Sequence, residues 1–138
     1  MSSGRLRIKV SRYMFLLFIS LFILCVLFQF LSVGLAMFVD SGNWVYHRNV
    51  VHLFGWNIPL LLLLFAYLGS LPRLMYGHIF GLFFFIFAMY FTANMRFQIP
   101  WIGALHPLFG LLLLAISCRS LKSIIKMIFS KNEQQEGV

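Results

Sequence analysis

The segment YMFLLFISLFILCVLFQFLSVGLAMF, which occupies residues 13–38, decides the fold because it contains no charged residue. A helix needs about 20 apolar residues to cross the hydrocarbon core of a bilayer. Three further apolar stretches follow, at residues 45–71, 74–95 and 100–118. With 62% hydrophobic residues and 17 phenylalanines in 138 residues, the chain has the composition of an integral membrane protein. The sequence therefore predicts an all-α, up-down bundle of four transmembrane helices.

The four spans leave little chain for a separate soluble domain. We expect residues 1–12 to form a basic cytoplasmic N-terminus, residues 13–118 the helix bundle, and residues 119–138 a cytoplasmic amphipathic or polar tail. A basic start before an apolar run also resembles a secretory signal. Because the apolar region is longer than the roughly 7 to 15 residues of a signal, we expect a retained first helix.

Basic residues are unequally distributed over the two sides of the predicted bundle. Arg48 and Arg96 fall on one side, and nine fall on the other: Arg5, Arg7, Lys9, Arg12, Arg73, Arg119, Lys122, Lys126 and Lys131. Lysine and arginine beside spans are kept preferentially in the cytoplasm, so both termini are expected there, in a multi-pass protein of the plasma membrane. Anionic lipid headgroups then account for the net charge of +8, and no nucleic-acid partner is required.

The motifs of several enzyme classes are absent from the sequence. It contains no zinc-finger spacing, CxxC pair, glycine-rich phosphate loop, Ser/His/Asp set or paired intramembrane carboxylates. Cys25 and Cys118 are expected at different depths, so we predict two free thiols. An electron-transfer or non-catalytic subunit therefore fits the sequence better than a hydrolytic enzyme.

Four histidines, His47, His52, His78 and His106, lie among apolar segments where polar side chains are costly. The first two lie in the outer half of the second span, and His106 lies in the outer half of the fourth. These two spans are diagonal neighbours in an up-down bundle, so a histidine from each at equal depth could ligate one haem iron from opposite sides. His78 lies near the cytoplasmic end of the third span without a histidine partner.

The choice between His47 and His52 as the second ligand stays open at this point. They are separated by about 7 to 8 Å along a helix and by about 140° around it, so only one can ligate the same iron as His106. The other could hydrogen-bond a propionate or lie at the interface. Arg48 or Arg96 could pair with a propionate charge.

Glycines lie close to the histidines on the second and fourth spans. Gly55, Gly103 and Gly110 lack the side chains that would keep a flat macrocycle away from the backbone. The same residues suit tight helix packing. Pro59 and Pro107 each follow one of these glycines by four residues and remove a helical hydrogen bond, so local kinks are expected.

Three short motifs carry a resemblance. The order of Trp44-x-x-His47-Arg48, the Gly-Ser-Leu-Pro-Arg turn at residues 69–73, and Leu105-His106-Pro107 resembles a family of small, uncharacterised prokaryotic four-helix membrane proteins. The architecture also resembles the haem-binding units of heme A synthase and b-type cytochromes. By that resemblance, His47-Arg48 matches the His-Arg pair on the second helix of heme A synthase, and His106 matches the fourth-helix ligand. Heme A synthase has a glutamate where this chain has Trp44, which argues against the synthase reaction.

These observations predict a membrane protein that binds one haem b near the outer face, through His106 and either His52 or His47. It would pass single electrons to a quinone or to a partner in a larger membrane complex or homo-oligomer. One alternative is a cofactor-free accessory or assembly subunit whose histidines hydrogen-bond between helices. Another is a quinone- or lipid-binding protein whose outer polar cluster forms the pocket.

The distribution of basic residues gives a testable topology. Cysteine labelling or reporter fusions after Ser41 and after Glu136 are expected to place the first position outside and the second in the cytoplasm. The reason is that arginines and lysines beside spans are kept preferentially on the cytoplasmic side. Labelling of both positions from the same side would contradict an even number of spans.

Overall fold

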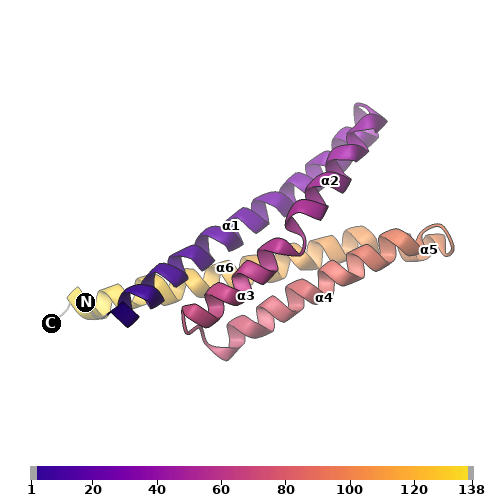
Figure 1. Ribbon diagram of the computed structural model, residues 1–138. Helices are drawn as coiled ribbons and strands as arrows, with labels where there is room; N and C mark the ends of the chain where they lie inside the picture. The colour runs from indigo at the N-terminus through magenta and orange to yellow at the C-terminus, as the bar shows by residue number, and fades with distance from the viewer. Residues whose placement is uncertain (1–2, 137–138) are drawn as a thin grey trace.

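The computed structural model describes the backbone of residues 3–136 and the side chains of residues 3–129. All of the regular structure in that part of the chain is helical (Figure 1). In chain order the elements are α1 (Ser3–Phe38), the 3₁₀ turn η1 (Ser41–Asn43), α2 (Trp44–Phe54), α3 (Asn57–Leu68), α4 (Arg73–Met95), α5 (Pro100–Gly103) and α6 (His106–Glu136).

Within the described residues, four helical segments are long and apolar enough to cross a membrane: Ser3–Phe38, Ser41–Leu68, Arg73–Met95 and Pro100–Phe129. The predicted all-α, multi-pass membrane protein is thereby confirmed. Two helices are longer than the sequence suggested, because α1 includes the basic stretch before Tyr13 and α6 continues well past Cys118. Arginine, lysine and leucine are good helix formers, so nothing stops either helix at the edge of its apolar run. The side chain of Lys131 lies outside the described residues.

The four spans form a ring in which each packs on its two neighbours. The first span packs on α2, α3 and α6; α4 packs on α3 and α6. The second and fourth spans therefore lie diagonally across the ring. In Figure 1 the beginning of α1, the α3–α4 connection and the end of α6 lie at one end, where most of the basic residues are found. We call this the inner end, and the opposite end the outer end.

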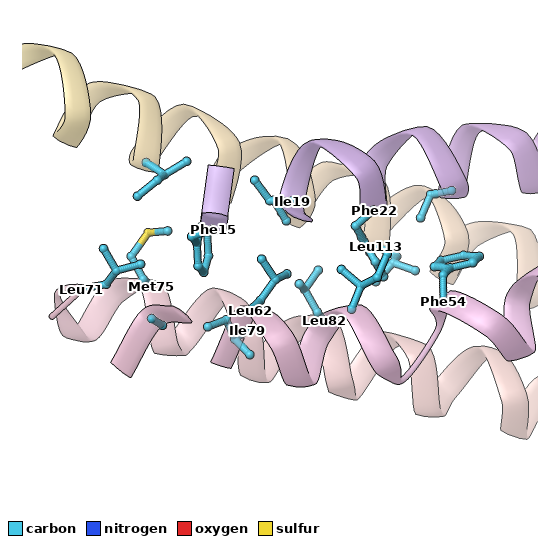
Figure 2. Close-up of a cluster of buried hydrophobic side chains, with 14 of the residues drawn as sticks. Phe15, Ile19, Phe22, Phe54, Leu62, Leu71, Met75, Ile79, Leu82 and Leu113 are labelled. Carbon is cyan, nitrogen blue, oxygen red and sulfur yellow. The ribbon is translucent and has the colours of Figure 1, made fainter. Parts of the chain in front are cut away.

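A single column of apolar side chains fills the ring from its inner end to about its middle (Figure 2). Leu71 and Met75 lie at the inner end of the column, and Phe54 and Leu113 lie at its outer end. Phe15, Phe22 and Leu62 are completely buried within it. Without a hydrophobic force between helices in lipid, this close packing is what holds the spans together. Both cysteines are free, as predicted.

The α3–α4 turn is tied to the first span at the inner end. The Leu71 amide donates to the Ala66 carbonyl over 3.0 Å, and Ser70 has a φ of 47°. This is the Schellman arrangement that ends many helices, with serine in the left-handed position that glycine usually takes. The Arg12 guanidinium donates through Nε to the Gly69 carbonyl over 3.1 Å. These bonds fix the ends of two spans against each other.

The predicted amphipathic tail forms the continuation of α6 rather than a separate segment. Ile124 and Ile128 are buried in the apolar column, together with Phe15 and Met75. The apolar face of the tail therefore packs on protein at the inner end of the bundle.

A pair of glycines on α4 offers a matched test of the α4–α6 contact. A β-carbon on Gly81 would collide with the Ile116 side chain of α6, whereas Gly77, one turn away, has open space in that direction. Gly81→Leu is expected to lower the free energy of unfolding by about 1–3 kcal/mol, because overpacking pushes the two helices apart. Thermal unfolding in detergent would measure this, with Gly77→Leu as the control. Equal melting temperatures for the two variants would contradict the packing of α4 on α6.

Candidate functional site

The outer halves of the spans diverge beyond the apolar column. In Figure 1 the outer part of α1 runs with α2, away from the outer part of α4 with α5. The second span breaks at Gly55–Trp56, between α2 and α3, and the fourth breaks at Ala104–Leu105, between α5 and α6. The kinks expected beside Pro59 and Pro107 are thereby confirmed. Proline cannot donate the helical hydrogen bond, so the helix of each span is interrupted beside its proline, and the second span changes direction there (Figure 1).

A cavity of about 870 Å³ lies between these diverging halves. Its inner boundary includes Phe54 and Leu113, at which the apolar column ends. The eight candidate residues from the sequence all line it: His47, Arg48, His52, Gly55, Arg96, Gly103, His106 and Gly110. The cavity is of the size and mainly apolar character of small-molecule and cofactor pockets.

His47 and His106 both line this cavity, and their rings are in edge contact with each other. Their ring centroids are 6.2 Å apart, and the rings are inclined at 61°. Two imidazoles that bind one metal from opposite sides, each with a metal–nitrogen bond of about 2 Å, place their centroids roughly 6 Å apart. The separation between the rings therefore has the size that a shared metal would require.

Hydrogen bonds determine which nitrogen of each ring faces away from the helix wall. The Nδ1 of His106 lies 2.9 Å from the Met89 carbonyl oxygen, and the Nδ1 of His47 lies 3.4 Å from that of Gln29. A carbonyl oxygen only accepts, so Nδ1 must carry the proton in both rings. In the neutral tautomer Nε2 then keeps its lone pair. Histidines that ligate metals commonly have this arrangement, with the other nitrogen bonded to a carbonyl.

The same local arrangement occurs twice in the molecule. The hydroxyl of Ser32 lies 3.3 Å from Nδ1 of His47, three residues along α1 from the carbonyl of Gln29. The hydroxyl of Thr92 lies 3.4 Å from Nδ1 of His106, three residues along α4 from the carbonyl of Met89. Each histidine is thus held by one turn of the preceding span, so the two halves of the chain supply equivalent supports.

His52 has a different environment. Its ring is exposed, and its Nδ1 lies 3.2 Å from the phenol oxygen of Tyr90 on α4. Tyr90 also stacks against Trp56, with ring centroids 6.3 Å apart. Of the two second-span histidines, the structure pairs His47 with His106, and it places His52 at the cavity wall beside an aromatic cluster.

The candidate glycines are close to protein atoms. A β-carbon on Gly103 would approach the β-carbon of Arg96 to 2.8 Å, and one on Gly110 would lie 3.4 Å from Met89 and from Phe30. At Gly55 it would lie 2.7 Å from the carbonyl oxygen of Val51. These glycines therefore allow close packing around the cavity, which is the second of the two roles that the sequence left open.

The two outer arginines lie at the cavity with their charges accessible. Arg48 and Arg96 are both exposed, and the Arg96 guanidinium lies 4.5 Å from the centre of the Phe97 ring. Exposed guanidinium groups beside a cavity can each donate several hydrogen bonds to a carboxylate. They would suit a ligand with acidic groups directed toward the outer surface.

His78 lies apart from this site, toward the inner end of α4. Its Nδ1 is buried, and in the described part of the chain it has no hydrogen-bond partner. It does not line the outer cavity. The expectation that His78 is separate from the outer polar cluster agrees with its position.

Sequence reasoning missed part of the site. Thr92, Met89 and Tyr90 contact the candidate histidines, yet no pattern in the sequence singled them out. The repeated spacing, in which a hydroxyl residue follows three positions after the residue whose carbonyl accepts from the histidine, is visible only once the histidines are placed in space. Gln29 and Ser32 had a weak signal, as polar residues in an otherwise apolar helix.

A metal ion alone has no obvious chelating set here. Among the described residues there is no group of three or more His, Cys, Asp or Glu side chains that could hold one. A haem needs only axial ligands from the protein, so a histidine pair suffices for it. The donor set, the tautomers and the cavity therefore fit a haem better than a bare ion.

One protein family resembles part of this chain. Residues 29–95 match a Family of unknown function (DUF6220). The matched segment is similar to that family from the outer half of α1 to the end of α4, and it contains His47 and His52 but not His106. No curated protein and no solved structure matches the chain. The comparisons thus include a family of unknown function, as the motifs suggested, and no haem-binding protein.

Proposed function

We propose that this protein binds one haem b in the outer cavity, with His47 and His106 as the axial ligands, and serves in single-electron transfer. The observation that carries the proposal is the adjacent pair of rings, with centroids 6.2 Å apart and both Nδ1 atoms within hydrogen-bond distance of backbone carbonyls. When bound, haem supplies a one-electron redox centre.

The residues around the pair have definite tasks in this proposal. Gln29 and Met89 would orient the two imidazoles through their carbonyl oxygens and so leave Nε2 of each ring available as a ligand. Arg48 and Arg96 would hold propionates near the outer surface. The apolar residues Val26, Phe54 and Ile86 would contact the macrocycle. Both termini would be cytoplasmic, in the plasma membrane, and the acceptor would be a quinone or a subunit of a larger complex.

The same hydrogen bonds also favour a second candidate, a cofactor-free accessory subunit. Each histidine joins neighbouring spans, α1 to α2 and α4 to α6, as a structural histidine would. The absorbance of the purified protein separates the two proposals. A reduced b-type spectrum supports haem, and a folded protein that binds no added haem supports the accessory role.

Single substitutions test the ligand pair. His47→Ala and His106→Ala are each expected to abolish a b-type spectrum, since six-coordination needs both rings. His52→Ala is the matched control on the same span, and it should retain the spectrum because its ring bonds Tyr90 at the cavity wall. Haem content and spectra after purification would be measured. Normal six-coordinate haem in His106→Ala protein would refute the site. Loss of the b-type spectrum in His52→Ala but not in His47→Ala would show that His52 is the second-span ligand.

His78 provides a test on the other side of the bundle. His78→Ala is expected to leave haem content unchanged, because the ring lies toward the inner end of α4 and does not line the outer cavity. Stability should change by no more than about 1–3 kcal/mol, the usual range for a buried polar group. Thermal unfolding and absorbance on the same sample would be compared. Cofactor loss from a still folded variant would move the site to the cytoplasmic side.

A further inference from the structure

Gln29 is a buried polar residue with an unused side chain. It is 7% exposed, and neither Nε2 nor Oε1 of its amide has a hydrogen-bond partner among the described residues. Its backbone carbonyl supports His47, and Gln29 is one of the residues that line the outer cavity. A buried amide without partners is costly, so a structural role alone would favour an apolar residue at this position.

The position of Gln29 separates its amide from the exposed arginines. Side chains in a helix lean toward its N-terminus, which for α1 is the inner end, so the Gln29 amide is directed inward from its own turn. The cavity also extends inward from the histidine pair. Phe54 and Leu113 each follow a histidine of the pair by seven residues, or about 10 Å of helix, and both line the cavity. The Gln29 amide is thus directed toward the mainly apolar inner zone of the cavity, which lies between the histidine pair and Phe54 and Leu113.

The chemistry of this zone restricts its ligand. An amide offers two N–H donors and one acceptor, so the group that it meets is a carbonyl or a hydroxyl. The lining residues Val26, Phe54 and Ile86 require an apolar ring or chain around that group. On α4, Tyr90 lines the same cavity and is a second residue there that carries a polar group. Haem b offers no carbonyl apart from its propionates, which suit the exposed arginines instead.

We propose that Gln29 donates a hydrogen bond to a ring carbonyl of a lipid-soluble quinone bound in the inner zone of the outer cavity. This rests on the proposed function in that it places the electron partner in the same cavity. A quinone combines an apolar ring with carbonyls and reaches the site through the bilayer. The cavity that would receive it lies between the diverging outer halves of the spans.

Decylubiquinone in detergent is the probe for this proposal. Its binding is followed by quenching of tryptophan fluorescence, because Trp44 lines the cavity. Decylbenzene, measured by competition, provides a ligand without carbonyls. We expect wild-type protein to prefer the quinone, and Gln29→Met to weaken quinone binding roughly three- to tenfold while leaving decylbenzene binding unchanged. Gln98→Leu, an exposed glutamine outside the cavity, is the matched control.

A second readout separates a binding role from a structural one. Without ligand, Gln29→Met should melt roughly 3 °C higher than wild type, since it removes an unpaired buried amide. A lower melting temperature with unchanged quinone affinity would overturn the proposal, as would wild-type protein that binds both probes equally or neither. The assay requires no haem. An absent b-type spectrum therefore counts against the haem site, and an unchanged quinone preference in Gln29→Met counts against this one.

Discussion

The close packing of apolar side chains in the inner half of the bundle is the constraint on which the outer half depends. In lipid the spans gain nothing from escaping water, so their positions are set by interdigitated side chains such as Phe15, Phe22 and Leu62. Where this column ends, the spans are free to separate. The break at Gly55–Trp56 adjoins that boundary, and the break at Ala104–Leu105 lies nearer the outer end of the fourth span. The outer cavity lies between these parts of the two spans.

The histidine pair illustrates how polar groups are accommodated at membrane depth. A backbone carbonyl in a helix already accepts one bond but has a second lone pair, so it can hold an imidazole N–H without breaking the helix. Met89 and Gln29 do this for His106 and His47, and Thr92 and Ser32 lie beside them. Nδ1 of each ring thereby has a hydrogen-bond partner in the protein. Nε2 keeps its lone pair in this neutral tautomer. The hydrogen bonds to the two carbonyls thereby fix the orientation of both rings.

Much of the fold followed from the sequence because four uninterrupted apolar runs leave few alternatives. The ends of α1 and α6 were harder to place, since basic residues mark the membrane boundary but do not stop a helix. At the site, depth arguments gathered the polar residues of the outer end, and the cavity brings all eight candidates together. They did not distinguish His47 from His52, because that choice depends on helix rotation and on the bend at Gly55. Tyr90 and Thr92 were missed, as tyrosine and threonine are ordinary in membrane helices.

The ring order of the spans has a consequence for biogenesis. Helix α6 closes the ring, because it packs on both α1 and α4 and carries Leu113 and Ile124 into the apolar column. It is synthesised after the other three spans. Until α6 enters the bilayer, the faces of α1 and α4 that it covers remain in contact with lipid. The apolar column then lacks its α6 residues, and His106 is not in place. Assembly of the outer cavity is thus a late event, because the fourth span supplies His106, Gly110 and Leu113 to its lining.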